Sequence, residues 1–242
     1  MNIIKVGHRG AAGHEPENTI RSFKRAIVLG ADMVECDVYR CKSGEPVVIH
    51  DATVDRTTNG QGQVHNLTLS EIKKLTIDNG ETIPTLQEVI DVCKNHVQLN
   101  IEIKDSIDAE AALRVIQQNN AYAWAMISSN YIEPLQQAHK LDPQLMTALI
   151  FYSTKTDTQD AFFALACLAV LPITLRMIVR HAKKSGAQWI NIMKQLANRY
   201  TVTALKKHGF KIGVWTVNES AEIKKIKSLG VDAIISNFPD RL

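Results

Sequence analysis

Two carboxylates and an imidazole lie close together in one stretch of this sequence. A β-hairpin is predicted over residues 33–51, because two extended runs flank a polar turn at Gly44. Side chains alternate between the two faces of a strand, so Glu35 and Asp37 share one face. A turn centred just before Gly44 would place Asp37 opposite His50. We therefore expect the hairpin to bring two acids and one base to the same place.

The elements that must position these groups alternate regularly along the chain. Predicted strands cover 3–7, 33–39, 46–50, 97–104, 124–129, 145–151, 189–192, 212–217 and 232–236. Predicted helices cover 20–29, 70–75, 86–94, 108–118, 132–139, an apolar region that ends near 184, 201–207 and 220–229. Such alternation indicates a parallel sheet with crossover helices. No linker or repeat interrupts it, so we expect a single domain over 1–242.

The strand count favours a (β/α)₈ TIM barrel, an α/β fold. The connection from Tyr39 to Pro46 is too short for a parallel crossover, so the strand over 46–50 must return antiparallel as the second arm of the hairpin. Eight parallel strands remain, and the length of 242 residues is typical of this barrel. Residues 52–84 form a small insertion after the second strand. An open doubly wound sheet is the alternative, but no Gly-x-Gly-x-x-Gly follows any strand.

Composition excludes several classes of protein. The net charge is only +3 and no dense block of Lys and Arg occurs, which argues against nucleic acid as a partner. The four cysteines show no CxxC spacing, so reduced thiols in a cytoplasmic protein are expected. The apolar run at the N-terminus is too short for a signal peptide.

One segment, 161–179, is unusually apolar. It is shorter than the roughly 20 residues of a spanning helix, and it contains Pro172. We expect a buried helix here. The alternative is a surface helix with peripheral contact to a membrane or to a partner.

The barrel geometry gathers further polar residues around the hairpin, because the carboxyl ends of the strands meet at one mouth. His8 and Arg9 follow the first strand, and Glu102 and Lys104 share one face of the strand over 97–104. Each of these groups alone could be a structural ion pair or a hydrogen-bonded core residue. Seven ionisable groups at one end of a barrel are difficult to explain as scaffold, since isolated buried charges are costly.

The chemistry of this set points to phosphate esters. Three carboxylates (Glu35, Asp37 and Glu102) repel one another unless a cation lies among them, and oxygen ligands favour a hard ion, Mg²⁺ or Ca²⁺. His8 and His50 suit a general acid and base near neutral pH. Arg9 and Lys104 suit an anionic substrate such as a phosphate. These groups together indicate metal-assisted cleavage of a phosphate ester.

The chain resembles the glycerophosphodiester phosphodiesterases. The matching pieces are His8-Arg9-Gly10, Pro16-Glu17-Asn18-Thr19, Val34-Glu35-Cys36-Asp37-Val38, Val48-Ile49-His50-Asp51, Asp55-Arg56-Thr57-Thr58 with Gly60 and Gly62, Ile83-Pro84-Thr85-Leu86, Ile101-Glu102-Ile103-Lys104, Ile127-Ser128-Ser129 and Val214-Trp215-Thr216-Val217-Asn218. They occur in order, nearly end to end.

The resemblance implies a metal-dependent barrel that hydrolyses glycerophosphodiesters, such as glycerophosphocholine or glycerophosphoethanolamine, to sn-glycerol 3-phosphate and an alcohol. It implies roles for ten residues: His8 and His50 as the acid–base pair, Glu35, Asp37 and Glu102 as metal ligands, Arg9 and Lys104 as phosphate contacts, Trp215 as a wall for the glycerol or head group, and Glu17 and Asn18 as supports of the site.

The C-terminal half departs from the pattern of that family. Asn130 stands where an aromatic residue is usual, Asn237 stands where an Asp is usual, and the segment 161–179 is more apolar. These differences concern substrate preference, and an apolar entrance would suit lysophospholipids, as in a lysophospholipase D. A barrel that binds phosphorylated head groups without catalysis is the alternative from another class of function. The attacking group, water or the neighbouring glycerol hydroxyl, and the oligomeric state are left open by the sequence.

Overall fold

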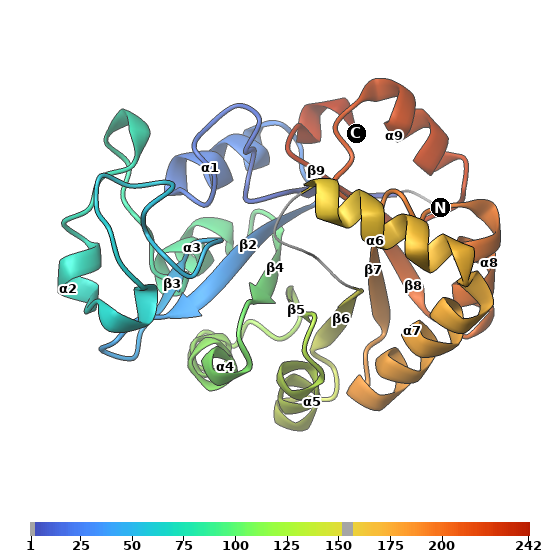
Figure 1. The fold of residues 1–242 in the computed structure, drawn as a ribbon. Helices are drawn as coiled ribbons and strands as arrows, with labels where there is room; N and C mark the ends of the chain where they lie inside the picture. Colours follow the sequence, from blue (N-terminus) through green and yellow to red (C-terminus); the bar gives the residue numbers. More distant parts are fainter. Residues whose placement is uncertain (1–2, 152–156) are drawn as a thin grey trace.

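Eight parallel strands close into a barrel in the computed structural model, which describes residues 3–151 and 157–242, with no side chains described for 157–161. The barrel strands are β1 (Ile4–Gly7), β2 (Met33–Arg40), β4 (Gln98–Ile103), β5 (Ala125–Ser129), β6 (Met146–Phe151), β7 (Trp189–Met193), β8 (Lys211–Trp215) and β9 (Ala233–Ser236). β1 pairs with both β2 and β9, which closes the sheet (Figure 1). The predicted (β/α)₈ barrel is confirmed, and the open doubly wound alternative is wrong.

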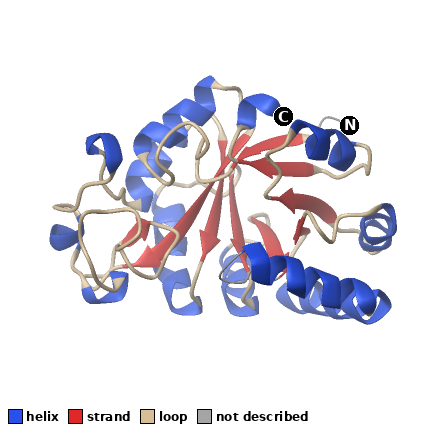
Figure 2. Cartoon of the chain, turned by 45° about the horizontal axis from the view of Figure 1, so that its top comes forward, coloured by secondary structure: helices blue, strands red, loops and turns tan. Residues whose placement is uncertain are grey.

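A ring of helices covers the outside of the barrel (Figure 2). The helices are α1 (Ile20–Val28), α3 (Leu86–Cys93), α4 (Ala109–Gln118), α5 (Ile132–Leu141), α7 (Leu171–Ser185), α8 (Arg199–Lys207) and α9 (Ser220–Lys227). Local capping fixes several of their starts. Thr19 accepts a hydrogen bond from the Ser22 amide, and Thr85 forms a capping box with Glu88.

The main core lies between the strands and these helices. On β4, Leu99, Ile101 and Ile103 point outward and are fully buried under the helices, as is Phe23 of α1. The alternate residues of β4 point into the barrel, which places Glu102 on the inner side. Burial of one strand face therefore fixes where the polar face must point.

The insertion predicted over 52–84 packs around a small core of its own, which includes Val54, Val64, Ile72 and Ile83. It carries the short helix α2 (Leu69–Ile72) and the 3₁₀ turns η1 (Val64–Asn66) and η2 (Asp78–Gly80). Two further 3₁₀ turns, η3 (Ser106–Asp108) and η4 (Pro239–Arg241), precede α4 and follow β9.

The hairpin exists, but its predicted register is wrong by one residue. β3 (Pro46–Val48) pairs antiparallel with β2 so that Val38 faces Val48. The amide of Ile49 then donates to the carbonyl of Asp37, so Ile49, and not His50, lies opposite Asp37. β3 ends at Val48 and the chain bends at His50. Since His50 lies beyond the strand, the alternation of strand faces does not govern its direction.

The expectation of a buried helix in the segment 161–179 is also wrong. The segment forms the end of α6 (Asp157–Ala169) and the beginning of α7, and the exposed fractions are 77% for Phe162, 65% for Leu165 and 64% for Ile173. No single helix in the described part of the chain is long and apolar enough to span a membrane. The pair Phe162–Ala169 and Leu171–Ser185, bent by 104°, meets that criterion of length and composition only when joined.

Candidate active site

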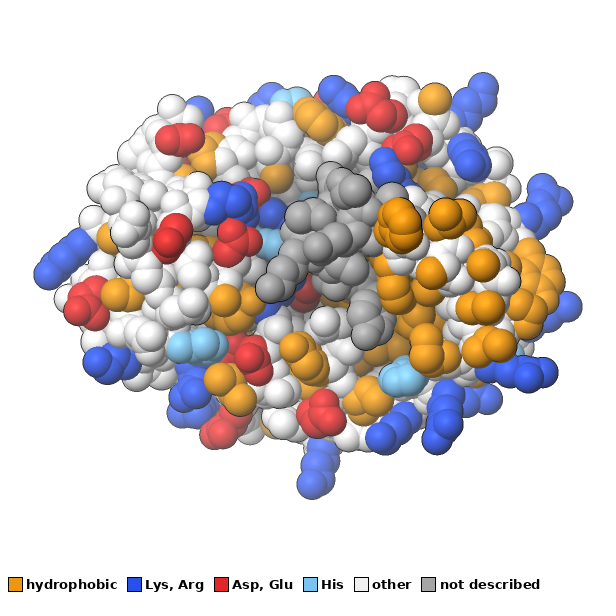
Figure 3. Space-filling view, in the orientation of Figure 1, with side chains coloured by type: hydrophobic (Ala, Val, Ile, Leu, Met, Phe, Trp, Pro, Cys, Tyr) orange, Lys and Arg blue, Asp and Glu red, His pale blue; other side chains and the backbone are white. Residues whose placement is uncertain are grey.

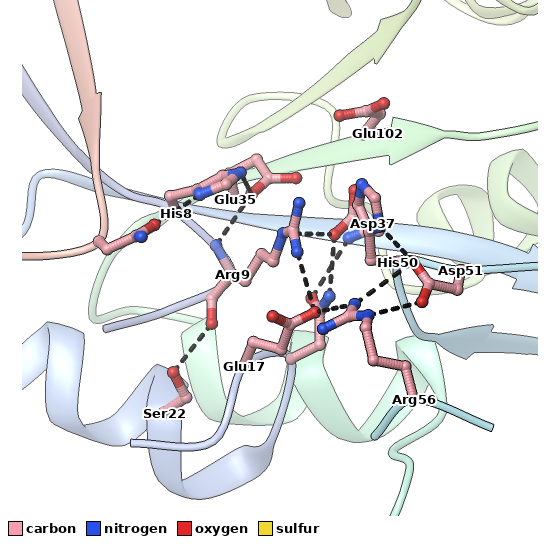
Figure 4. A network of polar contacts seen from close by, with 12 residues as sticks. His8, Arg9, Glu17, Ser22, Glu35, Asp37, His50, Asp51, Arg56 and Glu102 are labelled. Carbon is pink, nitrogen blue, oxygen red and sulfur yellow. Dashed lines mark hydrogen bonds and ion pairs between the residues drawn. The ribbon is translucent and has the colours of Figure 1, made fainter. Parts of the chain in front are cut away.

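The turn after β1 brings the first two polar side chains to the mouth of the barrel. Arg9 adopts a left-handed backbone with φ of 51°, and Gly10 follows with φ of 83°. A Cβ atom on Gly10 would lie 2.6 Å from the carbonyl carbon of Ser22, so only glycine fits. The Ser22 hydroxyl donates to the Arg9 carbonyl at 2.8 Å. This turn directs the Arg9 amide to Glu35 Oε2, at 2.9 Å (Figure 4).

Three carboxylates meet at the mouth in an arrangement that could hold a metal ion. One oxygen from each of Glu35, Asp37 and Glu102 lies within 4.8 Å of the others. β2 and β4 pair in parallel with Asp37 beside Glu102, which explains why the two strands deliver these acids together. Glu35 Oε1 is buried and has no hydrogen-bond partner among the described residues. An all-oxygen set with an unsatisfied buried ligand atom fits a hard divalent cation.

The two buried carboxylates differ in acidity because their neighbours differ. Burial, together with the nearby charges of Asp37 and Glu102, raises the pKa of Glu35 well above its usual value. Burial alone would also raise the pKa of Asp37, but the cations of Lys104 and Arg9 outweigh it and lower that pKa. Asp37 is therefore ionised before any metal arrives, and a cation beside Glu35 would favour its ionised form too.

Three side chains position Asp37. Asn18 donates to Oδ2 at 2.8 Å, and its backbone is left-handed, with φ of 56°. Arg9 Nε lies 3.3 Å from Oδ2, and Lys104 Nζ lies 3.3 Å from Oδ1 as an ion pair. Lys104 also donates to Glu102 Oε1 at 2.7 Å. These contacts orient the Asp37 carboxylate and keep the cations of Arg9 and Lys104 at the mouth, where they can bind an anion.

The two predicted catalytic histidines have different partners. His8 Nδ1 lies 2.7 Å from the amide oxygen of Asn237, a neutral group, and His8 Nε2 lies 3.9 Å from Glu35 Oε2. Burial and the neighbouring Arg9 cation lower the pKa of His8 to about 3. His50 Nδ1 lies 2.6 Å from a carboxylate oxygen of Asp51. One imidazole thus pairs with an amide and the other with an anion.

A chain of ion pairs connects His50 to the opposite side of the site (Figure 4). Arg56 Nε donates to Asp51 Oδ2 at 2.6 Å, and Arg56 Nη2 donates to Glu17 Oε1 at 2.7 Å. Glu17 Oε1 also accepts from Arg9 Nη1 at 2.9 Å. Burial raises the pKa of Asp51, but hydrogen bonds from Arg56 and His50 more than offset this and lower it. Asp51 therefore carries a full negative charge at neutral pH.

Sequence reasoning assigned no role to Asp51, Arg56 or Asn237. Asp51 directly follows His50, and an acid adjacent to a histidine was the available local signal. Arg56 comes five residues later, inside the insertion, and nothing in its spacing indicates a contact with Glu17. Asn237 contacts His8 across 229 residues of sequence, and no local spacing indicates this pairing.

Nine of the ten predicted site residues meet in this one network of contacts. Trp215 is the exception. It ends β8, its ring packs against the core, and its buried Nε1 has no partner among the described residues. The roles of all ten residues in catalysis stay predictions, since the geometry shows proximity and not turnover.

Comparisons with known proteins agree with this geometry. The model of the glycerophosphoryl diester phosphodiesterase family matches residues 8–241. A glycerophosphodiester phosphodiesterase of Caldanaerobacter subterraneus is 37% identical over 257 residues, covering 100% of this chain and 97% of the relative. A glycerophosphodiester phosphodiesterase of Bacillus altitudinis is 31% identical and covers 97% of this chain and 94% of its own.

Solved structures show the same fold. A phosphodiesterase of Oleispira antarctica in complex with the product sn-glycerol 3-phosphate superposes with a TM-score of 0.81 at 26% identity, covering 98% of this chain and 93% of that one. A glycerophosphodiester phosphodiesterase of Thermotoga maritima superposes with a TM-score of 0.79 at 26% identity, covering 99% and 96%. With the fold, the site and these similarities in agreement, the chain belongs to the glycerophosphoryl diester phosphodiesterase family.

Proposed function

We propose that the protein hydrolyses glycerophosphodiesters, such as glycerophosphocholine or glycerophosphoethanolamine, to sn-glycerol 3-phosphate and an alcohol. The observation that carries this proposal is the convergence of three carboxylates, two histidines and two cations at one barrel mouth. Family membership and the relative that binds sn-glycerol 3-phosphate support the substrate class.

Glu35, Asp37 and Glu102 would hold a divalent cation, Mg²⁺ or Ca²⁺, through their carboxylate oxygens. When bound, such an ion polarises a phosphoryl oxygen and offsets the negative charge that develops on it. Arg9 and Lys104 add fixed positive charge at the same mouth, and a phosphate there would exchange their present carboxylate contacts for its own oxygens. Trp215 would form a wall for the glycerol or the head group.

The contacts of the two histidines support an assignment of their roles. The amide oxygen of Asn237 accepts from His8 Nδ1, so His8 Nε2 is the unprotonated nitrogen at the mouth. His8 would therefore accept the proton of the attacking hydroxyl, from water or from the neighbouring glycerol oxygen. His50, paired with the Asp51 carboxylate, would donate a proton to the leaving alkoxide as its P–O bond breaks.

Steady-state kinetics with glycerophosphocholine test the proposal. Replacement of His8 or His50 by Ala should lower kcat by about 10²–10⁴ with the fold intact by circular dichroism. A chelator should abolish activity, and added Mg²⁺ or Ca²⁺ should restore it. Wild-type turnover in a folded His50→Ala variant would refute the acid–base assignment. Full activity in the chelator would refute the requirement for a metal. Binding of glycerophosphocholine without release of glycerol 3-phosphate would favour a head-group-binding barrel.

One observation favours a second candidate, the hydrolysis of lysophospholipids in the manner of a lysophospholipase D. The ring of Phe163 in α6 lies 6.2 Å from that of Phe151 at the end of β6, beside the barrel mouth, where this apolar pair would contact an acyl chain. A panel of lysophospholipids and glycerophosphodiesters compares the two. A higher kcat/KM for the lysophospholipids would make them the preferred substrates.

We also propose a cytoplasmic location, on the basis of the cysteines. All four are free and buried, and thiols of this kind are typical of a reducing compartment.

A further inference from the structure

The outer face of α6 and α7 carries a group of exposed apolar side chains. This α6–α7 apolar patch consists of Phe162, Leu165, Leu168, Val170, Ile173 and Met177, each between 37% and 77% exposed. In Figure 3, hydrophobic side chains gather over these two helices, on the right of the view. Isolated exposed apolar residues are ordinary on a protein surface, but a contiguous group marks a surface that contacts something else.

The charges in this part of the chain are almost entirely of one sign. Residues 161–218 contain nine Lys and Arg and no Asp or Glu. The rest of the chain holds the other 19 cationic side chains together with all 25 acidic ones. The overall charge of +3 is therefore the sum of +9 in this segment and −6 in the rest of the chain, which includes Asp157 and Asp160 at the start of α6. A surface of this kind attracts an anionic partner.

Several of these cations have no acidic partner among the described residues. Lys194 and Lys206 form ion pairs with Glu222 and Asp232. By contrast, the cations of α7 have no carboxylate within ion-pair distance in the described part of the chain. Three of them line a groove of about 430 Å³ between α7 and α8, together with His208 and an apolar floor; the three cations are Arg176, Arg180 and Lys183, and the floor includes Leu175, Val179 and Leu205.

The apolar and basic groups share the exposed face of α7. Ile173, Met177, Arg180 and Lys184 follow at intervals of four, three and four residues, so they lie on one side of the helix. The apolar pair lies at the start of α7, next to α6, and the basic pair lies toward its end. This side of α7 therefore presents apolar surface beside α6 and positive charge toward its end, and the interface of an anionic bilayer complements both.

The patch also adjoins the barrel mouth. α6 comes after the carboxyl end of β6, the same end at which the site residues lie. The ring of Phe163 in α6 lies 6.2 Å from that of Phe151 at the end of β6. An object that contacts the α6–α7 apolar patch would therefore lie beside the entrance to the site.

We propose that the α6–α7 face docks the protein on an anionic lipid bilayer, with the apolar patch inserted among the acyl chains and the cations of α7 against the lipid phosphates. An isologous dimer through this face would bring like charges together, which is unfavourable. A nucleic acid would complement the cations but not the projecting Phe162, Leu165 and Ile173. A bilayer with anionic head groups complements both parts.

Co-sedimentation of the intact protein with lipid vesicles tests this proposal. We expect binding to vesicles of phosphatidylcholine mixed with phosphatidylglycerol and much weaker binding to phosphatidylcholine alone. Binding to the mixed vesicles should weaken in salt of about 1 M, because the Debye length falls to about 3 Å and the charges are screened. The double variant Arg180→Glu, Lys184→Glu should lose at least about 25-fold in partitioning, since each cation near an anionic leaflet contributes about fivefold. Leu165→Asp and Ile173→Asp should each lose at least about tenfold.

Matched variants separate this surface from general effects. Val28, the last residue of α1, is 75% exposed, and α1 lies across the barrel from α7 (Figure 1), so Val28→Asp should leave vesicle binding unchanged. The double variant Lys224→Glu, Lys227→Glu in α9 reverses the same number of charges outside the α6–α7 face and should also leave vesicle binding unchanged. All of these variants should keep the wild-type turnover of a water-soluble substrate when no vesicles are present.

Three outcomes would overturn the proposal. The first is equal sedimentation with and without phosphatidylglycerol. The second is vesicle binding that survives Leu165→Asp and Ile173→Asp in folded protein. The third is a wild-type protein that does not bind vesicles but forms a dimer in analytical ultracentrifugation, when that dimer dissociates in those two variants.

Discussion

Replacement of Asp51 by Asn should slow catalysis without weakening substrate binding. Asp51 accepts from His50 Nδ1 at 2.6 Å and is itself fixed by Arg56 at 2.6 Å. A hydrogen bond to a charged group contributes about 1.5–3 kcal/mol, which corresponds to about 10- to 150-fold in rate if it is realised in the transition state. The side chains of His50 and Asp51 are 33% and 30% exposed, so solvent screening favours the lower part of this range. We expect kcat to fall about 10- to 50-fold, with KM within about twofold of the wild type.

Kinetics of four variants establish whether Asp51 acts through His50. If it does, the double variant His50→Ala, Asp51→Asn should be no slower than His50→Ala alone, because the second change has nothing left to act on. Asp55→Asn is the matched control, since Asp55 lies four residues after Asp51 and accepts only from the Gly62 amide among the described contacts. An unchanged kcat in Asp51→Asn, or losses that multiply in the double variant, would refute the positioning role.

Three further results are expected. Glu102→Gln removes one of the three clustered carboxylates, so the Kd for Mg²⁺ or Ca²⁺ from isothermal titration should rise at least about tenfold, and an unchanged Kd would place the metal elsewhere. Burial raises the pKa of Asp108 to about 6 from an ordinary 3.8, so the folded protein binds this proton more tightly than the unfolded chain does. The free energy of unfolding should therefore fall as the pH rises from about 4 to about 6. Asp108→Asn should flatten this pH dependence, measured by urea unfolding, and an unaltered dependence would contradict the assignment. Phe23→Ala empties a fully buried site under α1 and should lower the free energy of unfolding by about 3–5 kcal/mol, whereas a loss below about 1 kcal/mol would mean that the core closes around the gap.

The sequence alone was sufficient for the architecture. Alternating strands and helices, together with one connection too short for a crossover, predict eight parallel strands and one antiparallel arm, and the structure has these. Both signals are local, since periodicity and loop length follow from the geometry of the chain within each element. The same locality allowed Glu35, Asp37, Glu102 and Lys104 to be placed at the mouth, because the ends of barrel strands converge.

Contacts that depend on distant segments required the tertiary structure. The register of the hairpin differs by one residue from the prediction, since it depends on burial of the paired Val38 and Val48 in the main core as well as on the turn. The bend at His50, which lies outside the strand, delivers the imidazole to the mouth in spite of that shift. The chain from Asp51 through Arg56 to Glu17 joins an insertion to the first loop, and no spacing in the sequence encodes it.

In the segment 161–179, too, the sequence determined one property and the tertiary structure decided another. Its composition established that it is apolar, but whether an apolar helix is buried depends on what else covers the barrel. α7 occupies the place beside α5 and α8, so α6 packs against α7 and leaves Phe162 and Leu165 exposed. The sequence thus determined which residue types lie at each strand end and in each helix, whereas the closure of the barrel decided which of them meet at the site and which face outward.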